Sequence, residues 1–212
     1  IRKEKPTSRQ RERGVSSAEL LIVVAIVAVI SVVAIPQLGA ARRQFRFTGV
    51  QNEVATLLRY TRQQAMSQRQ AFTFQYDDTN KQIVVIDHET PGTGVLGGAG
   101  YPNTAGSRQD RVVSLIGGGM RAEDIVYGRP QGVAAEALDD TANLTALSGG
   151  RLNITFQPDG SVRDAANNPV NRALMLYNRQ DPQSLAGAIS VLGAAGRVKT
   201  WRYVHSGNKY VE

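Results

Sequence analysis

The feature that most constrains this chain is an apolar run near its N-terminus. Leu20 to Ile35 is a stretch of sixteen residues in which Ser31 is the one polar member. As an α-helix these residues span about 24 Å, and the flanking segments extend the helix to roughly the 30 Å of a bilayer core. The sequence therefore predicts a transmembrane helix over residues 15–38.

Charge is concentrated around this run. Residues 1–14 carry six basic and two acidic side chains, and residues 15–70 again carry six and two. Residues 71–212 carry thirteen basic and fourteen acidic ones, so the net charge of +7 belongs to the N-terminal third. A uniformly basic surface for general nucleic-acid binding is therefore not indicated. Under the positive-inside rule the leading basic cluster stays in the cytoplasm, and the C-terminal part lies across the membrane.

Three interpretations of the run compete. A cleaved secretory signal peptide would use the small residues Gly39-Ala40-Ala41, and the mature chain would then be an exported soluble protein. That interpretation leaves Glu19 unexplained and places Pro36 in the discarded part. A simple membrane anchor is the second interpretation. The third interpretation is based on the spacing between Gly14, the glycine before the run, and Glu19.

Four residues at fixed spacing resemble the N-terminus of type IV pilin-like proteins: Gly14, Val15, Glu19 and Pro36. In that family a prepilin peptidase cuts a short basic leader after its glycine. A glutamate is then the fifth residue of the mature chain, and a proline stands near the twenty-second. The resemblance implies that residues 1–14 are removed and that Val15 is the new N-terminus. The family usually begins with a methylated phenylalanine, so methylation of Val15 stays open.

Glu19 has a physical role in this interpretation. A carboxylate at the centre of a membrane helix costs about 2.5–3.5 kcal/mol on insertion scales, so it needs a partner. Cleavage exposes the amine of Val15, and in a stack of subunits Glu19 can pair with the amine of its neighbour and set the register of assembly. The alternative is local, because Ser16 and Glu19 fit the S-x-x-E capping box of a helix start.

The helical pattern continues beyond Pro36. Apolar residues recur at three- and four-residue steps, as Phe47, Val50, Val54 and Leu57. We expect one helix from about 16 to 69, bent at Pro36, whose amphipathic part, residues 39–70, buries one stripe against a sheet. Arg42 and Arg43 follow the apolar run where lipid headgroups would lie, which predicts contact with membrane lipid.

From residue 71 the apolar period changes to two, which is typical of strands. We expect an α+β fold in which the long helix packs on an antiparallel sheet or sandwich formed by residues 71–212. A loop is predicted over 88–110, and residues 129–150 contain no clear element. The predicted strands are 72–76, 83–86, 112–116, 125–127, 152–156, 174–177, 188–192 and 197–204.

Three later segments resemble the GspH/FimT family of minor pseudopilins and minor pilins. They are residues 44–76, which end in VATLLRYTRQQAMSQRQAFTFQY, then ITFQPDGSV at 154–162 and ISVLGAAGRVKTWRY at 189–203. The resemblance implies a non-enzymatic subunit that initiates or caps a type II secretion pseudopilus or a type IV pilus in the bacterial inner membrane. The implied partners are prepilin peptidase, other pseudopilins or pilins, and the inner-membrane assembly platform. Both machines use the same helix, so the sequence does not separate them.

The residue pattern predicts no enzyme. The two histidines, His88 and His205, are far apart in sequence, cysteine is absent, and no phosphate-binding loop or H-E-x-x-H motif is present. No cofactor is expected. A structural calcium ion is the alternative, because four oxygen-bearing side chains follow one another, although turns favour the same residues: Asp159, Asp164, Asn167 and Asn168.

A DNA-binding function is a further alternative. Arg197, Lys199 and Trp201 alternate on one face of a predicted strand, and Arg202 follows; cations around an aromatic ring can track phosphates and stack a base. Gly196-Arg197-Val198-Lys199 resembles the Gly-Arg-x-Arg element of DNA-binding FimT proteins, with lysine in place of the final arginine. The simpler interpretation is a solvated strand face.

Overall fold

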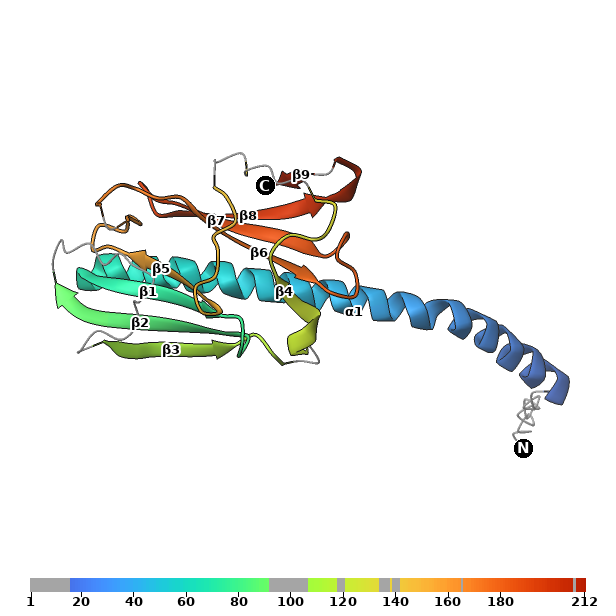
Figure 1. Cartoon of the computed structure of the whole chain (residues 1–212). Helices are drawn as coiled ribbons and strands as arrows, with labels where there is room; N and C mark the ends of the chain where they lie inside the picture. The colour runs from blue at the N-terminus through green and yellow to red at the C-terminus, as the bar shows by residue number, and fades with distance from the viewer. Residues whose placement is uncertain are drawn as a thin grey trace, which may run out of the picture. The chain divides into compact units, whose positions relative to one another are not determined.

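The computed structural model describes residues 16–91, 107–117, 121–133, 138, 142–164, 166–207 and 209–212. The boundary between its two compact units falls between Arg43 and Gln44. The predicted α+β class is confirmed, because a long N-terminal helix is followed by two antiparallel sheets (Figure 1).

The helix α1 spans Ser17–Gln68, within one residue of the prediction at each end. Its second half is amphipathic, as the sequence indicates. Among the buried positions, Thr61 donates its hydroxyl proton to the carbonyl of Leu57 over 2.7 Å, so this polar side chain is satisfied inside the helix. The other buried residues of this stripe are Phe47, Val50, Val54, Ala55, Leu57, Leu58 and Ala65.

The first sheet has the strand order β3-β2-β1-β5. Its strands are β1 (Gln70–Asp77), β2 (Gln82–Pro91), β3 (Arg108–Ser114) and β5 (Arg151–Phe156). The predicted hairpin is confirmed, and Phe74 pairs with Val85 across it. At the turn, the Asp77 carboxylate accepts hydrogen bonds from the backbone amides of Thr79 and Asn80, each over 3.0 Å.

The predicted loop over 88–110 is wrong at both ends, because β2 continues to Pro91 and β3 begins at Arg108. These strand ends are polar, so hydropathy alone did not reveal them. Their polar groups find partners across the strands: the Asp87 carboxylate accepts from Arg108 over 3.3 Å, and the ring of His88 bonds to Thr73 over 2.7 Å. Residues 92–106 lie outside the described part of the chain.

The second sheet has the order β4-β6-β7-β8-β9. Its strands are β4 (Ile125–Tyr127), β6 (Arg172–Asn178), β7 (Ala186–Leu192), β8 (Arg197–Val204) and β9 (Lys209–Val211). Short 3-10 turns precede β4 and β9, at Ala122–Asp124 and His205–Gly207. The sequence predicts all of these strands except β9, which has three residues and a ring contact between Tyr210 and Tyr203, with centroids 5.4 Å apart.

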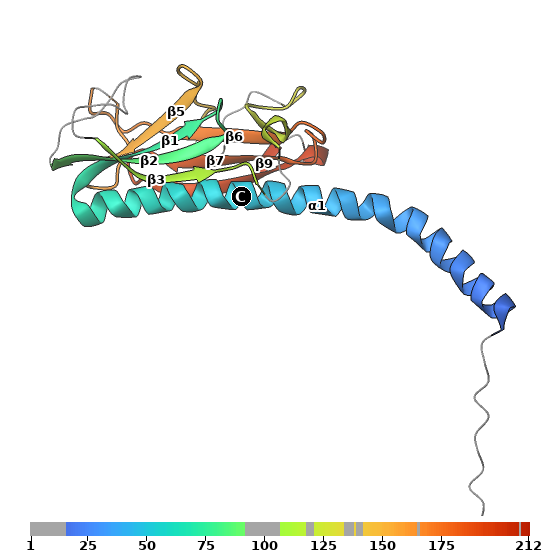
Figure 2. The same ribbon diagram turned by 90° about the horizontal axis from the view of Figure 1, so that it is seen from below.

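One hydrophobic core joins the second half of α1 to both sheets (Figure 2). Phe72, Phe74 and Tyr76 of β1 and Leu174 and Ile189 of the second sheet belong to it. A smaller cluster, which includes Trp201, lies on the other face of the second sheet. The two sheets also meet directly, because the rings of Tyr76 and Tyr127 stack with centroids 5.5 Å apart.

Two glycine turns meet beside α1. Gly196, between β7 and β8, has φ +59°, and a Cβ atom built there would lie 1.8 Å from the carbonyl oxygen of Gly160. The same carbonyl accepts a hydrogen bond from Arg62 of α1 over 3.4 Å. Gly196 is therefore required both by its left-handed backbone and by the close approach of a second chain segment.

We predict that Gly196→Ala lowers the free energy of unfolding by about 3 kcal/mol or more, from backbone strain plus the clash with Gly160. Gly149→Ala is the matched control, because Gly149 has φ +58° with no atom within 4 Å of the added Cβ. That control should lose about 1–2 kcal/mol. Urea unfolding of both variants measures the difference, and equal losses would show that the close approach has no energetic weight.

Candidate functional site

The start of α1 holds the residues to which the sequence assigns an assembly role. Ser17 is the first helical residue, and the carbonyl of Ser16 accepts a hydrogen bond from the amide of Leu20 over 3.1 Å. Ser16 is thus the N-cap residue and Glu19 the third helical residue, which are the two positions of a capping box. A carboxylate in the first turn also interacts favourably with the helix dipole. The predicted cleavage site at Gly14 and Val15 lies outside the described residues.

Glu19 is exposed, and its carboxylate has no hydrogen bond or ion pair with any described residue. The cap position thus fits the local interpretation, but the bond that a capping box expects, from the N-cap amide to this carboxylate, is not observed. The carboxylate is available to a group supplied from outside the described chain.

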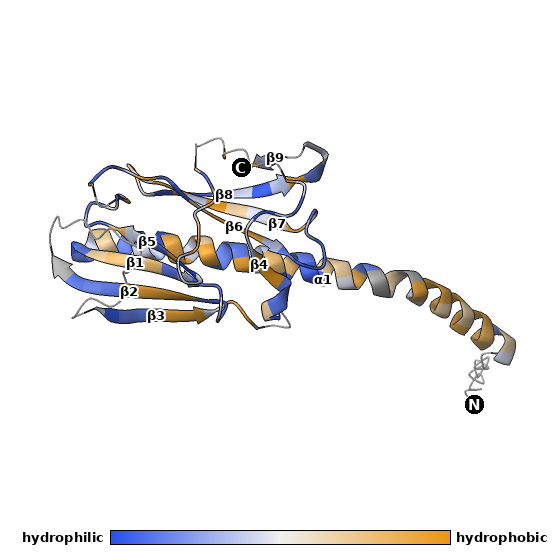
Figure 3. Cartoon of the chain, viewed as in Figure 1, coloured by the Kyte–Doolittle hydropathy of each residue, from blue (hydrophilic) through white to orange (hydrophobic). Residues whose placement is uncertain are grey.

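The first half of α1 is apolar on every side and exposed. Figure 3 shows hydrophobic colouring around this part of the helix, whereas the second half alternates. A helix that is hydrophobic all round requires an apolar surrounding. The exposed large side chains range from 54% to 73% accessible and are Leu20, Leu21, Ile22, Val23, Val24, Ile26, Val27, Val29, Ile30 and Val32.

By length and apolar composition, no single straight helix among the described residues could cross a membrane. The two segments of α1, Ser17–Val32 and Gln37–Gln68, which meet at a bend of 41°, are together long and apolar enough to do so. The residues between the two include Pro36, where the sequence predicts a bend. Arg42 is exposed and Arg43 is partly exposed at the end of the apolar run. Their contact with lipid stays a prediction.

The C-terminal strands hold the residues predicted for DNA binding. Arg197, Lys199 and Trp201 lie on one face of β8, as the alternation predicts, but that face is partly covered. Trp201 is 2% exposed, and its indole Nε1 donates to the Ser190 hydroxyl over 2.8 Å. The predicted stacking of a base on Trp201 is inconsistent with this burial. Arg202 is exposed on the opposite face of the strand.

The two cations on that face have a carboxylate partner. The Nζ atom of Lys199 lies 2.8 Å from Glu212 Oε2, and Arg197 lies 3.8 Å from Oε1 of the same side chain. The hydrogen bond from Lys199, helped by the charges of both cations, lowers the pKa of Glu212. A phosphate would have to compete with this carboxylate. DNA binding therefore stays a prediction without geometric support from Trp201.

The chain has a single tryptophan, so its fluorescence reports on Trp201 alone. We predict emission that is blue-shifted from that of the urea-unfolded chain and weakly quenched by iodide, because the ring is buried. Adding a single-stranded oligonucleotide should leave the emission unchanged, since no base reaches the ring. Quenching by the oligonucleotide that saturates with concentration would contradict the buried placement.

His88 is one of the buried titratable groups of the first sheet. Its Nε2 atom lies 2.7 Å from the Thr73 hydroxyl, which in turn lies 2.7 Å from the hydroxyl of Thr155. Its Nδ1 atom lies 2.9 Å from the Ser107 hydroxyl. Burial lowers the pKa of His88, although the nearby Asp87 carboxylate opposes this shift. The network is bound by hydroxyls on both sides, which suits a structural histidine.

A histidine with a lowered folded pKa binds its proton better in the unfolded chain, so stability is lost as the pH falls below the ordinary value of 6.5. We predict that the wild type is less stable at about pH 5.5 than at about pH 7.5, and that His88→Gln removes most of this difference. His205→Gln is the control, because His205 is exposed. Thermal unfolding at both pH values tests this, and an undiminished loss in His88→Gln would refute it.

Two of the four residues considered for calcium, Asp159 and Asp164, accept local hydrogen bonds. Asp159 Oδ1 accepts from the amide and hydroxyl of Ser161, and Oδ2 accepts from Arg163 over 3.2 Å. Asp164 accepts from the amides of Ala166 and Asn168. In the described part of the chain, no group of three or more acidic, histidine or cysteine side chains converges as a metal site would require.

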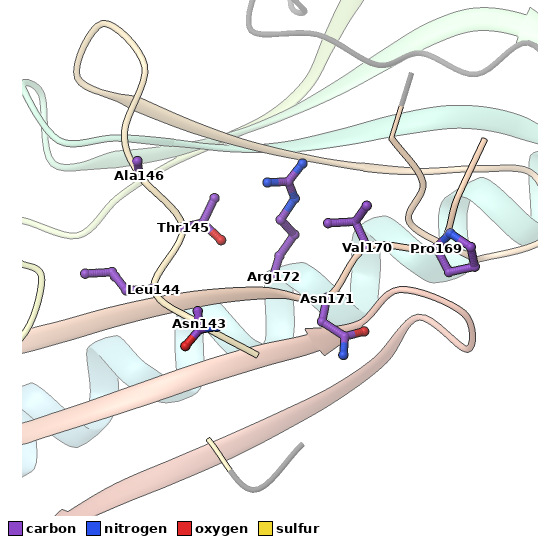
Figure 4. Close-up of a pocket in the computed structure, with 8 residues that line it drawn as sticks. All are labelled: Asn143, Leu144, Thr145, Ala146, Pro169, Val170, Asn171 and Arg172. Atoms are coloured by element: carbon purple, nitrogen blue, oxygen red, sulfur yellow. The ribbon is translucent and has the colours of Figure 1, made fainter. Parts of the chain in front are cut away.

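An open cavity of about 500 Å³ lies where residues 143–146 run beside the start of β6 (Figure 4). Arg172 is the one charged side chain of its lining, and Figure 4 shows it extending between Thr145 and Val170. The hydroxyl oxygen of Thr145 accepts a hydrogen bond from the backbone amide of Ala173 over 3.1 Å. A nucleophile with a neighbouring base is not among the described lining residues.

The fold and the exposed helix define a class of α+β protein in which half of a long helix packs on two antiparallel sheets and the other half exposes apolar side chains. Among solved structures, the type IV minor pilin FimU of Pseudomonas aeruginosa, strain PAO1, is similar over 78% of this chain and 92% of that chain, with a TM-score of 0.43 and 18% sequence identity. No protein-family model matches this chain, and no curated protein matches it.

Proposed function

We propose that this chain is the precursor of a pilin-like filament subunit of the minor pilin or minor pseudopilin kind. Its leader, residues 1–14, is removed after Gly14, and Val15 becomes the N-terminus. Residues 15–38 hold the subunit in the bacterial inner membrane before assembly, with the N-terminus on the cytoplasmic side and residues 71–212 beyond the membrane. The role is structural: the subunit starts or caps a short filament.

The observation that carries the proposal is the state of Glu19. An exposed carboxylate without a partner in the described chain stands at the first turn of a helix whose next side chains are apolar on all sides. In an apolar surrounding such a carboxylate costs several kcal/mol unless a cation pairs with it. The amine of Val15 in a neighbouring subunit supplies that cation at the same depth.

The remaining geometry supports a structural role. Arg172 has no acidic neighbour among the described residues that line the cavity of about 500 Å³. The buried histidine is held between hydroxyls. The choice between a type II secretion pseudopilus and a type IV pilus depends on the assembly platform. The membrane proteins that co-purify with the full chain identify the machine.

Glu19→Gln separates the two roles of this residue. Glutamine still serves a capping box but carries no charge. We predict that Glu19→Gln inserts into the membrane normally and is lost from the filament fraction, as Glu19→Ala is. N-terminal sequencing of the wild-type protein from producing cells should return Val-Ser-Ser-Ala-Glu. Normal incorporation of Glu19→Gln into the filament fraction would contradict the proposed charge pairing. A different N-terminal sequence would contradict the proposed function.

A further inference from the structure

One edge of the second sheet is covered over only part of its length. On one side, β8 pairs with β7 from Arg197 to Arg202. On the other side, β9 pairs with Arg202, Tyr203 and Val204 of β8. No described strand pairs with Arg197–Trp201 on that second side. Because an antiparallel strand directs N–H and C=O groups to both sides, this part of β8 is an open edge whose backbone groups lack a strand partner.

The side chains along the open edge alternate between two kinds. Arg197 and Lys199 lie on one face of β8, and Val198 and Thr200 lie on the other. Val198 packs against the main core and is partly buried, as is Thr200. Residues that pair directly across two strands share a face of the sheet. A strand that pairs here therefore needs acidic side chains on one face and apolar ones on the other.

The structure already places a carboxylate on these cations. Glu212, which follows β9, has its Oε2 atom 2.8 Å from Lys199 and its Oε1 atom 3.8 Å from Arg197. The ammonium of Lys199 also lies 5.0 Å from the centroid of the Trp201 ring. The two cations are two residues apart, about 6.6 Å along the strand, and one carboxylate serves both. A strand with acidic residues at alternate positions supplies one carboxylate to each cation.

The described strands of this chain do not offer such a segment. Among them, acidic residues at alternate positions occur in β2, as Asp87 and Glu89. β2 already pairs with β1 on one side and with β3 on the other. A described strand of a second copy therefore does not supply the missing partner, and the charge of the open edge selects an acidic segment of a different protein.

We propose that the open edge of β8 binds an extended segment of another protein by strand addition. Acidic and apolar residues alternate in that segment, and two of its carboxylates take the place of Glu212 on Arg197 and Lys199. Backbone hydrogen bonds to β8 hold the segment, and the two ion pairs fix its register. This inference goes beyond the proposed function and uses neither Glu19 nor the apolar half of α1.

A short synthetic peptide tests the proposal. The probe is Val-Glu-Val-Glu-Val, blocked at both ends and labelled with a fluorophore, and its anisotropy is measured as the full chain in neutral detergent micelles is added. We expect saturable binding. Val-Lys-Val-Lys-Val should not bind, because its charges repel the two cations. The acidic peptide with every backbone amide N-methylated should also fail to bind, because it keeps the carboxylates but has no N–H donors.

Three variants locate the binding site. The double variant Arg197→Gln/Lys199→Gln should weaken binding of the acidic peptide by roughly tenfold or more, since charge-assisted hydrogen bonds are lost. Glu212→Gln should strengthen it, because the competing carboxylate is removed while both cations remain. Arg202→Gln is the control, since Arg202 is exposed on the opposite face of the same strand, and its affinity should stay within about twofold of the wild type. Thermal unfolding confirms that each variant is folded.

Each other result overturns the proposal. Absence of binding to both the wild type and Glu212→Gln shows that the edge takes no strand. Equal binding of the N-methylated peptide shows attraction of charge without strand addition, and unchanged affinity in the double variant places the peptide elsewhere. Binding of a single-stranded oligonucleotide that the double variant abolishes, without binding of the peptide, assigns the edge to nucleic acid.

These outcomes are distinct from those of the proposed function. The peptide is added to the purified chain outside any filament, so a negative result leaves processing after Gly14 and the role of Glu19 untouched. Conversely, a mature N-terminus other than Val15 contradicts the proposed function and leaves the open edge of β8 as it is.

Discussion

The structure depends on a single helix, α1, whose apolar side chains are buried in the described core over only part of its length. From Phe47 onward, α1 buries one stripe in the core shared by both sheets. From Leu20 to Val32, ten large apolar side chains are exposed. Burying ten such side chains is worth on the order of 15–30 kcal/mol, which is comparable to or larger than the stability of a typical domain. The exposed half of this helix would therefore be stabilised by an apolar environment that the described part of the chain does not supply.

Much of this fold could be predicted from the sequence, because the period of the apolar residues changes once, near residue 71. Three- and four-residue steps predict α1, and the alternation around Phe74, Ile154 and Leu174 predicts strands that the structure contains. The parts that could not be predicted are stabilised by polar partners. The ends of β2 and β3 are held by bonds of His88 and Asp87, and such bonds leave no trace in hydropathy. The strand β9 is too short to show a period.

The placement of the candidate functional residues could also be predicted only in part. Alternation predicts that Arg197, Lys199 and Trp201 share a face of β8, and they do. It does not predict what covers that face, because Leu138 and Ala142 come from a segment with no periodicity of its own. The aromatic side chain that looked suited to stacking is instead part of a second core. The role predicted for Glu19 rests on its spacing from Gly14 and Pro36, and it stays a prediction.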